Sequence, residues 1–166
     1  MTGALHRVGQ FWRHASARVT PEERRAAERI LGPELSPLFL GLPINDQRHG
    51  LDVLATVTAI EGEPTRLLQQ AALLHDAGKG GVRFSVIDRS VAVFVSAISP
   101  SLLEAWLRAR PGFAARYRTY ADHARIGAEE LRSRGATELA AIVAEHHAAA
   151  PSSDLTRRLQ RADRRN

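Results

Sequence analysis

In the stretch "LLHDAGKG" at residues 73–80, an apolar helical pattern ends and a polar turn begins. His75 and Asp76 are adjacent near the C-terminus of the predicted helix, so their side chains diverge by about 100°. Two ligands that diverge in this way can hold one metal from two sides, or the carboxylate can bridge two metals. Lys79 follows three residues later and is the only lysine among 23 basic residues.

The composition limits the classes of protein that this chain can belong to. A length of 166 residues predicts one domain with a real hydrophobic core. The absence of cysteine excludes disulfides, thiolate metal sites and thiol nucleophiles. The longest uncharged run, residues 90–103, has 14 residues and contains Pro100, which is too short to span a bilayer. We therefore expect a soluble, cytoplasmic protein without a membrane partner.

The formal charge of +5 favours contact with phosphates or acidic partners. Two arginine-rich runs, at residues 108–118 and 157–165, are interpreted as solvated helix faces. An arginine-rich RNA-binding domain is a further alternative, but the chain has no recognised motif of that class and few aromatic residues for stacking. Nucleic acid is therefore not the expected partner.

Helix signals predict an all-α, single-domain bundle. Thr20 as N-cap, Pro21 at the first helical position and Glu23 form a helix start, and Gly32 ends that helix. Further helices are expected within 33–43 and at about 46–61, 65–77, 101–109, 119–134, 137–148 and 154–163. By periodicity alone the apolar segment 86–98 fits helix or strand, and we interpret it as helix because a lone strand would have no partner.

The N-terminal part is expected to pack on the rest of the chain. Residues 1–44 are predicted as a helical extension on a core of residues 45–166. The first 21 residues contain arginine but no acidic residue, as in a transit peptide. However, Leu5, Val8 and Trp12 fall at helical spacing and no cleavage-like motif follows, which favours a docked helix.

Five predicted helices each carry an ionisable residue where an apolar one is expected. These residues are His49, His75, His123, His146 and Asp163. A buried polar group needs a partner, and a buried carboxylate needs one most. A single such histidine is most often a core residue with one hydrogen bond, but several that converge indicate a shared ligand.

A divalent cation would satisfy this set, which also includes Asp76 and His147. Carboxylates and neutral imidazoles offer many acceptor atoms and few donors, and together they suit Mn, Fe, Zn, Ni or Co better than Ca or Mg. Gly127 lies one turn after His123 and would let another backbone approach closely there. The sequence therefore predicts a metal site in the core of the bundle.

These residues resemble the HD superfamily of metal-dependent phosphohydrolases. The minimal pattern H…HD…D matches His49, His75, Asp76 and Asp163, and "HDAGK" resembles the HD-x-G-K form. The stretch "DHARIGAEEL" at 122–131 is similar to the H-x-x-x-G-A element of extended members. The resemblance implies that His123 and the pair His146-His147 are further ligands and that two metals are bound. The layout is also similar to small uncharacterised bacterial HD proteins.

The chain departs from two extended groups of the superfamily. The HD-GYP cyclic-dinucleotide phosphodiesterases have a D-G-x-G-Y-P element after the histidine pair, where this chain has "AAAPSSD". The diadenosine tetraphosphate hydrolases have a histidine followed by threonine where this chain has two histidines. Trinuclear members carry a glutamate one turn before the first histidine, but this chain has Asn45. These departures argue against cyclic di-GMP as substrate and against a third metal.

The resemblance implies hydrolysis of a phosphate ester or phosphoanhydride, with a nucleotide or dinucleotide as the expected substrate. Asp76 and Lys79 are the predicted catalytic residues, since a lysine ammonium is a compact point charge that fits beside metals. Arg116, Arg118 and Tyr120 are candidates for substrate binding, although they would equally cover a surface. The alternative is a metal-containing HD module that senses a ligand or binds a partner without turnover. The sequence does not indicate an oligomeric state.

Overall fold

The fold is known from a computed structural model, which describes residues 18–80, 88, 91, 94–95 and 98–166. Every regular element among these residues is a helix, which confirms the all-α prediction. The helices are α2 (Pro21–Leu31), α3 (Ser36–Leu40), α4 (Ile44–Glu61), α5 (Arg66–Leu74), the 3₁₀ turn η1 (Ala77–Lys79), α7 (Pro100–Ala109), α8 (Pro111–Ala121), α9 (His123–Ser133), α10 (Thr137–Ala144) and α11 (Asp154–Asp163).

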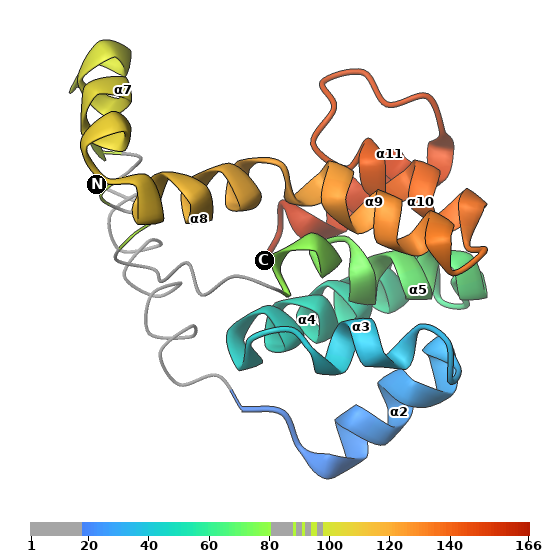
Figure 1. The fold of residues 1–166 in the computed structure, drawn as a ribbon. Coiled ribbons are helices and arrows are strands. Elements are labelled where there is room, and N and C mark those ends of the chain that lie inside the picture. Colours follow the sequence, from blue (N-terminus) through green and yellow to red (C-terminus); the bar gives the residue numbers. More distant parts are fainter. Residues whose placement is uncertain (1–17, 81–87, 89–90, 92–93, 96–97) are drawn as a thin grey trace, which may run out of the picture.

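Helix α5 lies in the middle of the bundle and packs against α2, α3, α4, α10 and α11 (Figure 1). The five residues from Ala71 to His75 are all buried, so this helix has almost no solvent-facing side at its C-terminal end. Burial of its leucines contributes about 1.5–3 kcal/mol each relative to exposure. The turn that follows α5 is thereby held at the centre of the molecule.

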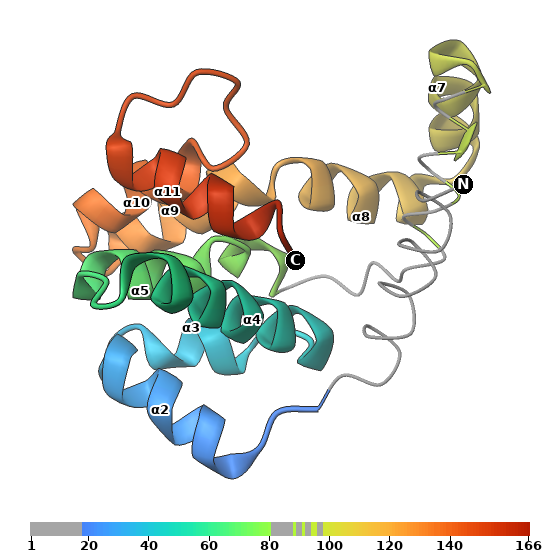
Figure 2. The same ribbon diagram turned by 180° about the vertical axis from the view of Figure 1, so that it is seen from behind.

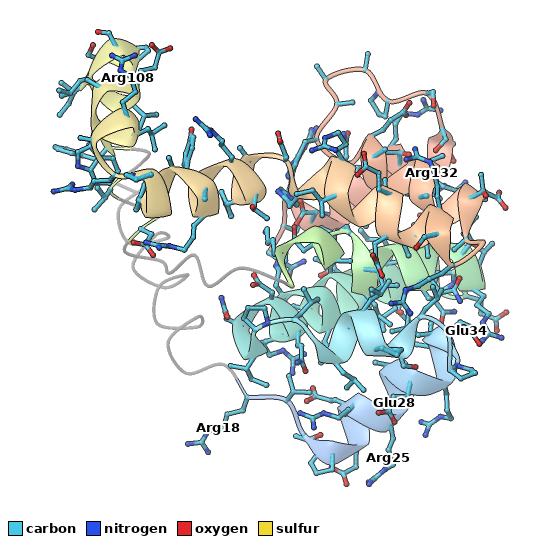
Figure 3. All side chains as sticks on the ribbon, viewed as in Figure 1. Arg18, Arg25, Glu28, Glu34, Arg108 and Arg132 are labelled. Atoms are coloured by element: carbon cyan, nitrogen blue, oxygen red, sulfur yellow. The ribbon has the colours of Figure 1, made fainter. Side chains whose placement is uncertain are left out.

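Helices α7 and α8 stand away from this bundle, and both views show α8 as the arm that links α7 to α9 (Figures 1 and 2). The C-terminal end of α11 lies near the middle of the molecule in the same views. Charged side chains cover the outer surface, as the labelled Arg25, Glu28 and Arg132 illustrate (Figure 3). In the part of the chain that the structure describes, no helix is long and apolar enough to cross a membrane.

Most predicted helix boundaries agree with the structure. The helix start at Thr20 is a complete capping box, in which Thr20 and Glu23 exchange hydrogen bonds of 2.9 and 3.2 Å. Within the predicted helix 86–98, the described positions 88, 91, 94, 95 and 98 are helical. The other positions of that segment, and the predicted N-terminal helix before residue 18, lie outside the described residues.

The single helix predicted at 119–134 is wrong, because the chain forms two helices that meet at Asp122. This residue has φ −94° and ψ 7°, outside the helical region. Neither proline nor glycine marks the break in the sequence. Two other predicted helices are too long: α5 ends at Leu74 and α10 at Ala144, so His75, His146 and His147 lie in turns just beyond helix ends.

Candidate metal centre

Five segments bring seven histidine and aspartate side chains together in the bundle. The residues are His49 in α4, His75 and Asp76 after α5, His123 at the start of α9, His146 and His147 after α10, and Asp163 at the end of α11. Six of the seven lie at or just beyond helix ends, where neighbouring residues leave the helical path and can point in divergent directions. Each of the seven predicted ligands therefore lies close to others of the set.

The first cluster contains His49, His75, Asp76 and Asp163. Ligand atoms of the first three all lie within 4.8 Å of one another, a spacing that could hold a metal ion. The Oδ1 atom of Asp163 lies 2.9 Å from Nε2 of His49 and 3.7 Å from Nε2 of His75. Asp163 is 114 residues from His49 in sequence, and it closes the group at its more exposed side.

The second cluster contains His123, His146 and His147, whose ligand atoms also lie within 4.8 Å of one another. The Nε2 atom of His123 lies 3.3 Å from Nε2 of His146 and 3.1 Å from Nε2 of His147. Metal–nitrogen bonds of about 2.1 Å place two ligand atoms ~3.0–3.4 Å apart on one ion. The cluster therefore has the spacing of a preformed ligand set.

Backbone carbonyls fix the tautomers of three of these histidines. The Nδ1 atoms of His75, His123 and His146 donate to carbonyl oxygens three residues earlier, at 3.0, 2.6 and 2.6 Å. A carbonyl oxygen can only accept, so each proton is on Nδ1 and each neutral ring turns an Nε2 lone pair into the site. Metal-binding histidines commonly have such a partner on the other nitrogen. These carbonyls were not predicted from the sequence, because every residue has a main-chain carbonyl and no residue type marks the ones that accept.

Asp76 lies between the two clusters. Its Oδ2 atom lies 3.6 Å from Nε2 of His75, in the first cluster. Its Oδ1 atom lies 3.2 Å from Nε2 of His123 and 4.0 Å from Nε2 of His146, in the second. The two oxygens of one carboxylate thus face different histidine sets.

The electrostatics of the site favour the metal-binding protonation states of His146, Asp76 and Asp163, but not that of His49. Burial lowers the pKa of His49, but Asp163 and Asp76 outweigh burial and raise this pKa. Burial lowers the pKa of His146 to about 3, so its ring is neutral at pH 7. Burial raises the pKa of Asp76, but His75, Lys79 and His123 outweigh it and hold this pKa well below its usual value. Burial also opposes ionisation of Asp163, but its hydrogen bond with His49 lowers the pKa of the carboxyl. Carboxylates stay charged and the buried imidazole stays neutral.

Two glycines let the turn after α5 reach α9. A Cβ atom on Gly78 would overlap the carbonyl oxygen of His123 and lie 2.7 Å from the backbone nitrogen of Gly127. A Cβ on Gly127 would lie 2.9 Å from the backbone nitrogen of Gly78. The predicted close approach at Gly127 is thereby confirmed, and its partner is Gly78. This contact brings Asp76 within reach of the histidine at the start of α9.

Lys79 lies beside the clusters. Its Nζ donates to Oδ2 of Asp76 at 2.6 Å, and its side chain is 12% exposed. The ammonium also lies 5.4 Å from the centre of the Tyr120 ring, which is 5.8 Å from the His123 ring. Lys79 and Tyr120 therefore share a partly open side of the site.

The structure separates the other two predicted substrate-binding residues from this group. Arg116 lies over the ring of Phe113, with 5.7 Å between guanidinium and ring centre, and lines a pocket near α7. Arg118 is exposed on α8. Their roles in substrate binding stay predictions.

A comparison with protein families matches the HD domain model to residues 47–165. Neither a comparison with curated proteins nor one with solved structures finds a match. The matched range covers more than two thirds of the chain and contains both clusters with all seven side chains. HD domains are generally metal-dependent phosphohydrolases, and the histidine and aspartate clusters indicate divalent metal binding. The chain therefore belongs to the HD domain family.

Proposed function

We propose that this protein is a dinuclear, metal-dependent phosphohydrolase that hydrolyses a phosphate ester or phosphoanhydride of a nucleotide or dinucleotide. One observation carries the proposal, namely that the two oxygens of Asp76 face different histidine clusters. His49, His75, Asp76 and Asp163 would hold one cation. Asp76, with the histidines of the second cluster, would hold the other. The ligand chemistry suits Mn, Fe, Zn, Ni or Co.

Bound divalent cations supply a lowered pKa for water and charge stabilisation at phosphoryl oxygens. The residues of this chain orient that chemistry. The carbonyls behind His75, His123 and His146 keep each Nε2 lone pair directed into the site. The close packing between Gly78 and α9 keeps the Asp76 carboxylate between the clusters. No cysteine can act as nucleophile, and direct attack by water fits the available groups.

Lys79 supplies a positive charge beside the reacting phosphate in this proposal. Its ammonium contacts Asp76 and faces Tyr120, so a phosphate oxygen that reached the clusters would lie near it. A lysine ammonium turns freely and occupies less space than a guanidinium. Tyr120 would contact the substrate at the same side. A cytoplasmic location and a small phosphorylated substrate complete the proposal.

The experiment combines metal analysis with a substrate panel. Purified protein is stripped with chelator, reloaded with Mn, Fe, Zn, Ni or Co, and assayed by mass spectrometry of bound metal. Each form is then incubated with bis(p-nitrophenyl) phosphate, nucleoside mono-, di- and triphosphates, and dinucleotides. We expect about two metals per chain and hydrolysis that disappears in an Asp76→Asn variant.

The outcomes separate the proposal from its alternatives. Two bound metals with no turnover on any substrate would identify a sensing or partner-binding HD module instead. One bound metal with turnover would retain the phosphohydrolase and remove the bridging role of Asp76. Turnover that survives chelation and the Asp76→Asn change would reject the metal mechanism.

A further inference from the structure

A pocket of about 380 Å³ lies at the junction of α7 and α8, where Arg110 alone separates the two helices. Its lining includes the side chains of Trp106, Phe113, Arg110 and Arg116. This pocket is separate from the histidine clusters, since none of the seven candidate ligands lines it. A cavity with flat apolar walls and a few polar groups is the usual form of a small-molecule site.

The aromatic wall is formed by Trp106 and Phe113. Their rings lie 4.3 Å apart at an interplanar angle of 63°, in an edge-to-face arrangement. Edge-to-face packing holds both rings in place without stacking them face to face. Phe113 is buried and Trp106 is half-buried, so a flat ligand ring would stack mainly on Trp106.

Two guanidinium groups lie against the same rings. Arg110 lies 4.9 Å from the centre of the Trp106 ring, and Arg116 lies 5.7 Å from that of Phe113. Asp88 also lines the pocket, so the lining residues that the structure describes carry a net charge of one positive. Such a site favours a ligand that is both aromatic and anionic, because arginine binds phosphate through a planar fork.

Helix α8 connects this pocket to the metal centre. Gly112 and Arg116 line the pocket. Tyr120, four residues after Arg116, lies beside Lys79 and His123. Residues four apart lie on one face of a helix. The rise from Gly112 to Tyr120 is about 12 Å along the helix axis. A ligand that followed this ridge would have one end in the pocket and the other at the histidine clusters.

We infer that the α7–α8 pocket is a subsite for the aromatic, anionic part of the substrate that is distant from the reacting phosphorus. This inference rests on the proposed phosphohydrolase function. It assigns the substrate to one class, an elongated nucleoside polyphosphate or dinucleotide. The base stacks on Trp106, Arg110 contacts an anionic group in the pocket, and Arg116 binds phosphate along the ridge. Lys79 receives the phosphoryl group that reacts.

The binding test uses metal-free protein, so that it does not depend on turnover. The chain has two tryptophans, and a Trp12→Phe background leaves Trp106 as the only one. In chelator, the fluorescence of Trp106 is titrated with ATP, adenosine and inorganic triphosphate. We expect ATP to bind at least tenfold more tightly than either part, and Arg116→Gln and Arg110→Gln to weaken ATP binding at least fivefold each. Arg108→Gln is the matched control, since Arg108 is an exposed α7 residue, 73% exposed, that does not line the pocket (Figure 3).

The kinetic test uses the metal-loaded enzyme and the nucleotide that it turns over fastest. Arg116→Gln should raise KM at least fivefold and change kcat less than twofold, since the arginine would bind substrate without touching the reacting phosphorus. Turnover of inorganic triphosphate, which has no base, should be unaffected by Trp106→Phe. Circular dichroism and metal content confirm that each variant is folded and loaded.

The two tests fail in distinguishable ways. If ATP leaves the fluorescence of Trp106 unchanged, or if Arg108→Gln weakens binding as much as Arg116→Gln, the pocket is not a nucleotide site. If ATP binds there but KM is unchanged in Arg116→Gln, the pocket is not a substrate subsite. If ATP binds and the enzyme turns over no phosphate compound, the proposed function and the subsite role are both rejected and a separate nucleotide-binding pocket is left.

Discussion

The Nε2 atoms of His123 and His146 lie 3.3 Å apart, and both rings donate their Nδ1 protons to backbone carbonyls. In their neutral forms, therefore, two lone pairs face each other inside the protein. The Nε2 atom of His147 lies 3.1 Å from that of His123 and adds a third ring nitrogen. One proton can bridge only two of these atoms, whereas one divalent cation can bind all three. The geometry of this pair is the strongest reason to expect a metal at the second cluster.

Each cluster should lose its own metal when one of its ligands is removed. We expect His123→Ala, His146→Ala and His147→Ala each to lower the metal content by about one per chain, and His49→Ala to lower it by about one at the other cluster. Mass spectrometry of the reloaded variants measures this. Glu145→Gln is the control, because its carboxylate binds Ser152 in a loop and should leave the metal content unchanged. Unchanged content in all three variants of the second cluster would mean a mononuclear site.

The contact between Gly78 and α9 should tolerate no side chain. An added methyl group on Gly78 would overlap the backbone of His123 and Gly127, so Gly78→Ala should lower the free energy of unfolding by about 3 kcal/mol or more. Gly80→Ala is the control, since its Cβ would meet its nearest atom at 3.4 Å in a helical backbone conformation. Its effect should stay within about 0.5 kcal/mol. Urea denaturation of both metal-free variants provides the measurement, and equal midpoints would contradict the packing.

Lys79→Arg should keep the positive charge at this position, but the larger side chain should no longer fit beside Asp76. The Lys79 side chain is largely buried against Asp76, where the wider guanidinium would displace a neighbour. We expect normal folding and metal content with turnover reduced at least about tenfold, equivalent to about 1.4 kcal/mol of transition-state stabilisation. Arg125→Lys, at an arginine that is 61% exposed, is the reverse swap and should be silent. Equal turnover in wild type and Lys79→Arg would remove Lys79 from the reaction.

The metal-free protein should lose stability as the pH falls from 6.5 to 5. Burial lowers the pKa of His146 from its ordinary value of 6.5 to about 3, so the unfolded chain binds a proton in this range and the folded chain does not. The free energy of unfolding therefore falls with decreasing pH, by about 1.5 kcal/mol for this residue alone. His75 and His147, whose pKa values are also lowered by burial, act in the same direction.

His49 does not cancel this trend. Burial lowers its pKa, but its hydrogen bond with Asp163 and the nearby carboxylates outweigh burial and raise the pKa above 6.5. Its stabilising effect is fully present below 6.5 and is lost as the pH rises through the folded value. Urea midpoints in chelator at pH 6.5, 5.75 and 5 test the prediction, with His146→Gln expected to show a smaller slope. A stability that is flat across this range would show that His146 is protonated in the folded protein.

The sequence by itself determined the helical class and the residue types of the site. Local signals are sufficient for this, since the capping box at Thr20 and the apolar periodicity before His75 depend only on residues a few positions apart. Polar residues on apolar stripes singled out His49 and Asp163 as groups in need of partners, and in the structure both are half-buried. The sequence also predicted the close approach at Gly127, because a missing side chain leaves room for another backbone.

Only the tertiary structure decided which atoms meet. No local signal breaks the helix at Asp122, because that break accompanies the packing of Gly78 against the first turn of α9. The division of the ligands into two clusters around Asp76 likewise depends on five segments that are far apart in the chain. The carbonyls that fix the histidine tautomers belong to the main chain, which every residue shares, so no pattern of residue types could reveal them. Local periodicity reports which face of a helix is buried, but the partner buried against that face is set by the packing of the whole bundle.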